Sequence, residues 1–117
     1  MNKSFDEIVA SLIEVIKQSE SYQEYVSARE KVEHDSDLLW KIDEIRKLNM
    51  RIRSIQNSDE AYDEMDKLEK RCDELSEDQR VYDFIEAENQ FMGMYQEISR
   101  RILEEIKLIK VIYYEQH

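Results

Sequence analysis

Apolar residues recur at three- and four-residue spacings along most of the chain, and this period predicts a series of amphipathic helices. The first apolar stripe covers residues 5–16 and follows a capping box, in which Ser4 is paired with Glu7 three residues later. A second capping box, Ser21 with Glu24, predicts the start of a second and shorter helix. The amino-terminal part of the chain is therefore expected to form two helices.

Two further stripes predict a helical hairpin in the middle of the chain. A long stripe covers residues 38–55 and ends near Asn57, and in residues 61–75 the apolar positions alternate between steps of four and three. Residues 41–53 carry five basic and two acidic side chains, whereas residues 59–78 carry ten acidic and three basic ones. Antiparallel pairing of the two helices would bring these opposite charges together, namely Arg46, Lys47, Arg51 and Arg53 near Asp63, Glu64, Asp66 and Glu69.

The longest stripe runs from Val81 towards the C-terminus, behind a third capping box formed by Ser76 and Gln79. A straight helix from Val81 to Tyr114 would be about 50 Å long, because an α-helix rises about 1.5 Å per residue. A compact globule of this chain length is only about 35 Å across. Part of this helix is therefore expected to project, unless Gly93 divides it into two shorter helices.

Composition supports an all-α fold. The chain has no proline and one glycine, so it lacks the residues from which the tight turns of β-sheet proteins are usually built. Charged residues make up 38% of the chain and apolar residues 41%, a balance typical of helices with solvated outer faces. We expect a single domain over residues 1–117, an antiparallel helical bundle of about five helices with a long C-terminal helix.

The end of the chain is the strongest candidate for a functional surface. Apolar residues between 103 and 114 lie on more than one side of the predicted helix, which is more than one core-facing stripe requires. We expect a homodimer through this helix, with the partner-binding positions Ile98, Ile102, Ile106, Ile109 and Tyr113. Two alternatives are a central helix covered by its own neighbours and a short terminal strand at residues 111–114.

Glu88 is a charged residue between Phe84 and Phe91, where the stripe would place an apolar one. A partly buried carboxylate needs a cationic partner, and Arg29 and Arg46 are the candidates. We expect a structural salt bridge at this position, because polar groups in helical stripes often fix the register of packing. The alternative is a contact with a binding partner.

The remaining candidate residues give no sign of catalysis, metal binding or a cofactor. Cys72 lies within an apolar stripe without a second cysteine, and His34 lies in a polar break between helices. One glycine does not suffice for a Gly-rich phosphate loop or a nucleophile elbow. We therefore expect a protein that is not an enzyme, with no catalytic residues, no metal ligands and no cofactor.

Charge and hydropathy restrict the partners further. The formal net charge is −11, which repels phosphate backbones and argues against direct nucleic-acid binding. The basic residues 46–53 are the one route to a weak RNA-binding module, and the acidic helix that follows would already neutralise them. No apolar run approaches ~20 residues and no signal-peptide core follows Met1, so we expect a cytoplasmic protein without membrane contact.

With these residues in view, the chain resembles the YlbF/YmcA family of small helical bacterial proteins. The resemblance covers nearly all of the chain, and its most distinctive parts are the Ala87–Glu88 pair and the Ser19–Glu20–x–Tyr22 step. The other matching positions are Leu12, Ile16, Tyr25, Ala28, Val32, Asp35, Leu38, Ile42, Ile45, Val81, Phe84, Tyr95, Glu97, Ile98 and Ile102.

The resemblance implies a self-associating helical fold and a regulatory role, since some members act in competence, sporulation and biofilm development as a complex that assists ribonuclease Y in mRNA processing. It therefore implies paralogous family members or a ribonuclease as partners. Some members hold iron–sulfur clusters through cysteines, but a lone Cys72 does not supply the four thiolates that a cluster usually needs. A self-assembling structural protein with no regulatory role is the alternative.

Overall fold

The computed structural model describes residues 4–55 and 59–106, and every regular element in these ranges is an α-helix. The helices are α1 (Phe5–Lys17), α2 (Glu20–Glu30), α3 (Ser36–Ser54), α4 (Asp59–Leu75) and α5 (Gln79–Ile106). This confirms the all-α fold class and the five predicted helices. Gly93 does not divide the last helix, because α5 continues through it without a break.

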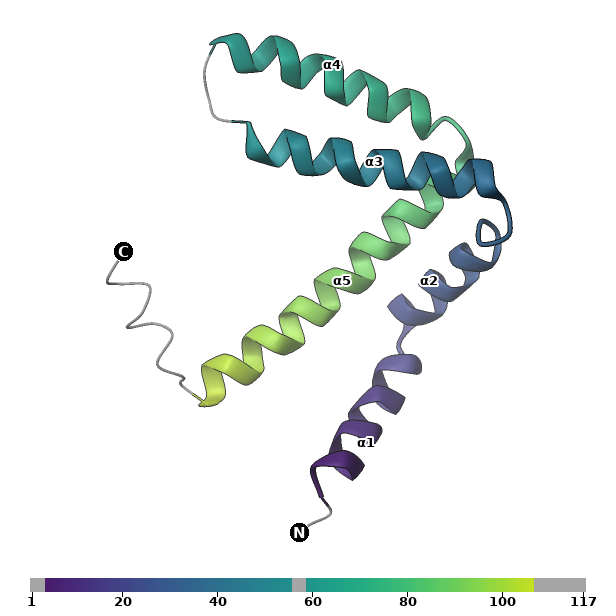
Figure 1. The fold of residues 1–117 in the computed structure, drawn as a ribbon. Helices are drawn as coiled ribbons and strands as arrows, with labels where there is room; N and C mark the ends of the chain where they lie inside the picture. Colours follow the sequence, from purple (N-terminus) through teal and green to yellow (C-terminus); the bar gives the residue numbers. More distant parts are fainter. Residues whose placement is uncertain (1–3, 56–58, 107–117) are drawn as a thin grey trace.

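The helices form two layers that meet at one corner (Figure 1). Helix α2 packs antiparallel against the first half of α5, while α3 and α4 form a hairpin that crosses α5 near its start. The buried core lies at this crossing and is entirely apolar, comprising Ala28, Val32, Leu38, Ile42, Ile45, Leu75, Val81, Phe84 and Ala87. The corner thus holds α2, the α3–α4 hairpin and the start of α5 together.

Two of the helix starts follow the sequence pattern. Ser4 is the N-cap of α1, although its side chain makes no capping hydrogen bond. Asp35, in the polar break before α3, accepts hydrogen bonds on Oδ1 from the backbone N–H groups of Asp37 and Leu38. A carboxylate in this position satisfies backbone donors that the first turn of a helix leaves free.

The second capping box was placed two residues too late. The N-cap of α2 is Ser19 and not Ser21, because the Ser19 hydroxyl accepts a hydrogen bond from the backbone N–H of Tyr22 at 3.2 Å. The same hydroxyl donates to the carbonyl oxygen of Ile16 at 2.6 Å, in the last turn of α1. One serine therefore ends α1 and starts α2, which leaves a very short connection between the two helices.

The third capping box was also wrong. The Ser76 hydroxyl donates to the carbonyl oxygen of Cys72 at 2.7 Å, at the end of α4. The start of α5 is capped instead by Asp78, whose Oδ1 accepts from the backbone N–H of Arg80 at 2.9 Å. Serine serves either helix end, because its hydroxyl both donates and accepts, so the sequence step alone did not identify the cap.

The predicted charge pairing between α3 and α4 forms at one pair of residues. Arg51 donates from Nε to Glu64 Oε1 at 2.9 Å across the hairpin. Lys47 instead pairs with Asp43 of its own helix, at 3.0 Å. The predicted turn at Asn57 lies outside the described residues.

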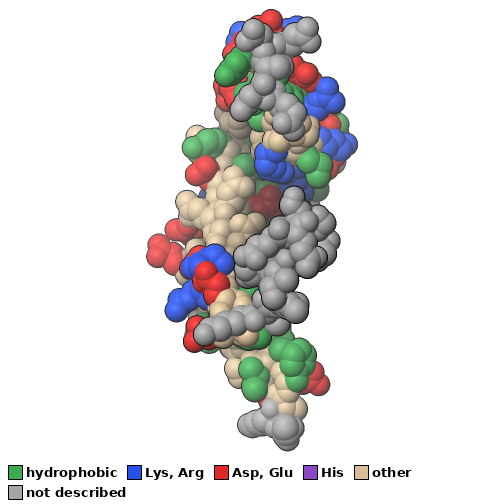
Figure 2. Space-filling view, turned by 90° about the vertical axis from the view of Figure 1, so that its left-hand side faces the viewer, with side chains coloured by type: hydrophobic (Ala, Val, Ile, Leu, Met, Phe, Trp, Pro, Cys, Tyr) green, Lys and Arg blue, Asp and Glu red, His purple; other side chains and the backbone are tan. Residues whose placement is uncertain are grey.

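The molecule is more extended than a compact domain of this length. Its radius of gyration is 18.7 Å, against about 13 Å expected for a globular chain of 117 residues. Helix α1 and the second half of α5 both extend away from the corner, and hydrophobic side chains lie exposed at the α1 end (Figures 1 and 2). The predicted projection of the last helix is therefore present in the structure.

Candidate protein-interaction surface

The apolar stripe of α5 is buried in its first half. Val81, Phe84 and Ala87 belong to the core. One helical turn after Ala87, the Phe91 ring lies 5.6 Å from the rings of both Tyr22 and Tyr25 of α2, centroid to centroid. Aromatic pairs at this distance stabilise packing beyond the area that they bury. Helix α2 therefore covers the α5 stripe as far as Phe91.

The same stripe continues past Phe91, beyond the end of α2. We call Tyr95, Ile98, Ile102 and Ile106 the distal stripe, because their spacing places them on the same side of α5 as Phe91. Ile98 is partly buried, whereas Tyr95, Ile102 and Ile106 are 51%, 46% and 59% exposed. A continuous apolar stripe that is buried at one end and open at the other is typical of an association surface.

The cover ends because α2 is too short. Helix α2 has 11 residues and α5 has 28, and Tyr22, in the first turn of α2, already contacts Phe91. Beyond this point lies α1, which precedes α2 nearly end to end and diverges from α5 (Figure 1). The candidate partner-binding residues Ile98, Ile102 and Ile106 thus share this open side, while Ile109 and Tyr113 lie outside the described residues.

Glu88 lies beside the stripe and is paired with Arg46. Arg46 of α3 donates from Nε to Glu88 Oε1 at 3.2 Å and from Nη2 to Glu88 Oε2, so that two parallel bonds join α3 to α5. The Arg46 guanidinium also lies 5.8 Å from the centroid of the Phe84 ring. Of the two partners considered for Glu88, the structure therefore selects Arg46, while Arg29 pairs with Glu33 at 3.5 Å.

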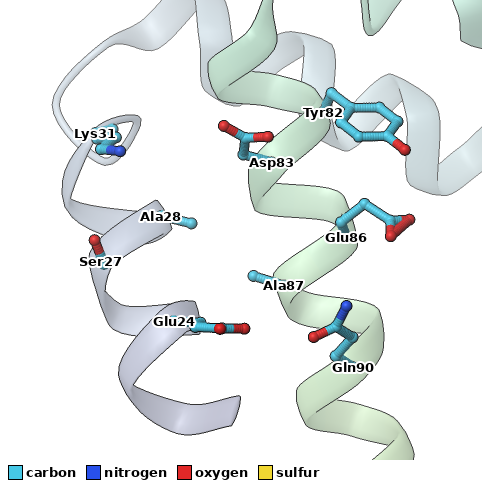
Figure 3. A pocket seen from close by; sticks show the side chains of 9 residues that line it. All are labelled: Glu24, Ser27, Ala28, Lys31, Tyr82, Asp83, Glu86, Ala87 and Gln90. Carbon is cyan, nitrogen blue, oxygen red and sulfur yellow. The ribbon is translucent and has the colours of Figure 1, made fainter. Parts of the chain in front are cut away.

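A shallow groove separates α2 from α5 on the side of Ala28 and Ala87 (Figure 3). It has a volume of about 330 Å³, and the charged residues of its lining are Glu24, Asp83 and Glu86 with the single basic residue Lys31. The groove exists because two alanines, far apart in the sequence, face each other where larger residues would fill the space. Sequence analysis did not identify it, since each alanine alone fits an ordinary helix position. Its chemistry suits at most a cationic side chain.

The cysteine and histidine that sequence analysis considered lie apart from each other. Cys72 is partly buried in α4, with Sγ 3.8 Å from Asn49 Oδ1, and it lines a cavity of about 150 Å³. Burial raises the pKa of the Cys72 thiol, and the nearby Asp73 and Glu69 carboxylates raise it further, so the nucleophilic thiolate is disfavoured. His34 is exposed and lies 3.6 Å from Glu33. In the part of the chain that the structure describes, no group of three metal-binding side chains comes together.

Three of the four basic side chains that offered a route to RNA pair with carboxylates in the structure, and the fourth, Arg53, is exposed. Arg46 pairs with Glu88, Lys47 with Asp43, and Arg51 with Glu64. Phosphate contacts at these positions would have to displace those carboxylates. Separately, none of the described helices is both long enough and apolar enough to cross a bilayer.

Comparison with known proteins assigns the chain to a family. Residues 6–107, which include all five helices almost completely, match the family model described as control of competence regulator ComK, YlbF/YmcA. The comparisons found no match among curated proteins and none among solved structures. Since the matched region spans most of the sequence, the chain belongs to the YlbF/YmcA family.

Proposed function

We propose that this chain is a non-enzymatic regulatory adaptor that self-associates and acts through protein–protein contacts of the distal stripe. The observation that carries the proposal is the change along one stripe of α5, which α2 covers as far as Phe91 and which from Tyr95 onwards is largely exposed, with Ile98 partly buried. The surface is apolar and flanked by charges, which is the composition of a protein interface.

The regulatory part of the proposal follows from the family, whose description names control of the competence regulator ComK. The more specific part is that the chain works in a complex assisting ribonuclease Y-dependent mRNA processing and developmental regulation, and this part rests on what the resemblance implies. Its partners would then be a second copy, a paralogous family member or the ribonuclease. Direct RNA binding is not needed for such a role, and the pairing of Arg46 and Arg51 with carboxylates argues against it.

Substitution of the distal stripe tests the proposal. Replacing both Ile102 and Ile106 with Glu places two charges on the open surface, and desolvating them would oppose association. We expect wild-type protein to be a dimer in sedimentation equilibrium and the double variant to be a helical monomer by circular dichroism. The matched control replaces Asn89 and Gln96 with Glu, because these exposed residues lie on another side of α5 and add the same charge.

Affinity capture from the producing cells then separates the alternatives. A protein partner that is recovered with and without nuclease, with wild-type and control chains but not with the double variant, supports the adaptor. Recovery that disappears on nuclease treatment would favour an RNA-binding module instead. If the double variant remains a dimer, the distal stripe is not the interface; if it unfolds, these residues belong to the core.

A further inference from the structure

Helix α1 carries a second apolar face that the described residues leave uncovered. It contains no buried residue, and Phe5, Ile8 and Val15 are 78%, 66% and 65% exposed. The apolar positions lie on one side of the helix, whereas the acidic residues Asp6, Glu7 and Glu14 lie away from its centre. Isolated helices shorter than about 12–15 residues are marginal in water, and α1 has 13 residues. Its stability therefore depends on a surface to pack against.

The position of α1 relates it to the distal stripe. Helix α2 packs on the first half of α5 and α1 precedes α2 nearly end to end, so α1 and the second half of α5 both lead away from the corner (Figure 1). The two segments diverge, and no packing comparable to that between α2 and α5 joins them. One molecule thus has two exposed apolar faces, one on α1 and one on the second half of α5, that do not cover each other.

We infer that two copies of the chain exchange α1, so that α1 of each copy packs on the distal stripe of the other copy. This inference rests on the proposed self-association and adds the segment that covers the stripe. A twofold axis makes each contact occur twice, and one interface therefore covers all four open faces.

The two faces match in length. At about 1.5 Å per residue, the 13 residues of α1 are about 20 Å long and residues 92–106 about 22 Å long. Large apolar side chains that are 38–78% exposed occur on both segments, and they are Phe5, Ile8, Leu12, Ile13, Val15, Met92, Tyr95, Ile102 and Ile106. Covering them would bury an area on the order of the ~800 Å² per partner that stable dimers use.

Charge favours a protein surface over a lipid surface as the occupant. Helices that lie on membranes are usually rich in Lys and Arg on their polar side, whereas α1 has three acidic residues and one basic residue. Next to the distal stripe, Arg101 lies close enough to Glu97 of the same helix to help lower the pKa of that carboxyl. Residues 92–106 of α5 carry three acidic and two basic residues, so neither segment has the basic excess of a helix that lies on a membrane.

Crosslinking between mixed chains tests the exchange. In a Cys72→Ser background, one chain carries Leu12→Cys and a second, differently tagged chain carries Ile102→Cys; the chains are mixed, refolded together and treated with a short bismaleimide. We expect a product with the combined mass of both chains, formed several-fold more than in the control that pairs Ala10→Cys with Ile102→Cys. Ala10 is an exposed residue on another side of α1, which makes this control a matched one.

Hydrogen exchange gives a second readout that needs no new cysteine. Replacing Ile102 and Ile106 with Glu should reduce the protection of α1 amides several-fold, although the substitutions are in α5. Loss of protection confined to α5 would overturn the exchange.

The other outcomes are distinguishable. If the wild-type chain sediments as a dimer but yields no crosslinked product, the exchange is wrong and the proposed self-association stands; a wild-type monomer would contradict both. A chain that carries both cysteines, diluted into cysteine-free chain, tests packing of α1 within one molecule, and efficient crosslinking there would overturn the exchange. Efficient crosslinking of Leu12→Cys to Val111→Cys within one chain would also overturn the exchange. A third contrary result would be that α1 amides are protected from hydrogen exchange only when anionic phospholipid vesicles are added.

Discussion

Glu88 shows how one charged residue can fix the way two helices pack. It lies beside the apolar stripe of α5, and Arg46 of α3 reaches it through two hydrogen bonds while also lying against the Phe84 ring. Bidentate Arg–carboxylate pairs are directional as well as attractive, so they favour one register of the crossing helices. The position that departs from the apolar pattern is therefore explained by packing between α3 and α5.

A double-mutant cycle measures this contact. We expect the coupling free energy between Arg46→Ala and Glu88→Ala to be about 1 kcal/mol in chemical denaturation, because the pair is bidentate but partly exposed. Arg46→Lys should lose most of this coupling, since an ammonium group does not reproduce the two parallel bonds.

The Arg51–Glu64 pair serves as a matched control for the cycle. It also bridges two helices, but both of its side chains are more exposed than those of the Arg46–Glu88 pair. Its coupling free energy should therefore be smaller, at roughly 0.5 kcal/mol or less. Equal coupling in the two pairs would show that the position of Glu88 next to the stripe adds nothing.

Asp78 predicts a dependence of stability on pH. The side-chain hydrogen bonds from Arg80, together with the Arg80 backbone N–H, lower the pKa of Asp78 from 3.8 to about 2. Folding thus favours the ionised carboxylate, and its stabilising effect is present above the ordinary pKa and is lost as the pH falls towards 2. We expect Asp78→Ala to lower Tm at pH 7, and the Tm difference from wild type to shrink between pH values of about 4 and 2.

Asp78→Asn separates the cap from the charge. Asparagine keeps an oxygen that can accept from the Arg80 backbone N–H, but it loses the ion pair. Its Tm should lie between those of wild type and Asp78→Ala, with no titration below pH values of about 4. A Tm difference between wild type and Asp78→Ala that stays constant throughout this pH range would assign the effect to packing.

At the scale of the elements, α5 contains a glycine that lowers the stability of the helix. Gly93 lies in the middle of the helix, and a Cβ added there would meet no atom within 4 Å. Glycine within a helix is less stable than alanine by roughly 0.5–1 kcal/mol, because it loses more backbone entropy on folding. We therefore expect Gly93→Ala to raise the free energy of unfolding by about this amount, measured by urea denaturation.

Gln96→Ala is the control for the substitution of Gly93. Gln96 is also exposed in the middle of α5, and glutamine is already a good helix former, so little change is expected. If Gly93→Ala destabilises the protein while Gln96→Ala does not, another chain must approach α5 closely at Gly93.

The helices were predictable from the sequence, whereas their caps were only partly so. The apolar stripes of α3 and α5 repeat the helical period over many residues, so a single polar residue within a stripe does not obscure the helix. A cap depends on one hydrogen bond, and several residues compete to make it. Ser19 caps α2 although it is Ser21 that begins a Ser-x-x-Glu step, and Asp78 caps α5 although Ser76 begins a Ser-x-x-Gln step. Tertiary and local geometry decide between such candidates.

The candidate site was predictable in part for a related reason. Spacing showed that Ile98, Ile102 and Ile106 share one side of the last helix, but it did not show how far α2 would cover that side. For α1, the stripe was evident, yet its open face was not, because an apolar stripe looks the same whether its partner is in the same molecule or in another. Exposure is a property of the arrangement of helices and needs the structure.

At the scale of the whole molecule, these observations predict that stability depends on protein concentration. Its radius of gyration exceeds that of a compact domain, and its two open apolar faces contribute to stability only when something covers them. If a second copy does so, association and folding are linked, and dissociated chains lose the packing of α1 and the distal stripe. The midpoint of unfolding should then rise with protein concentration.

Thermal unfolding over a range of concentrations measures this linkage. For a dimer that dissociates as it unfolds, each tenfold rise in concentration adds about 1.4 kcal/mol per dimer to the apparent stability. We expect a steady rise in Tm for wild type and for the Asn89→Glu, Gln96→Glu control. The Ile102→Glu, Ile106→Glu variant should show a lower Tm with no concentration dependence, because a monomer unfolds without dissociating from a second chain. A wild-type Tm that is independent of concentration would mean that the corner formed by α2, α3 and α5 holds all of the stability, and that the open faces serve a different partner.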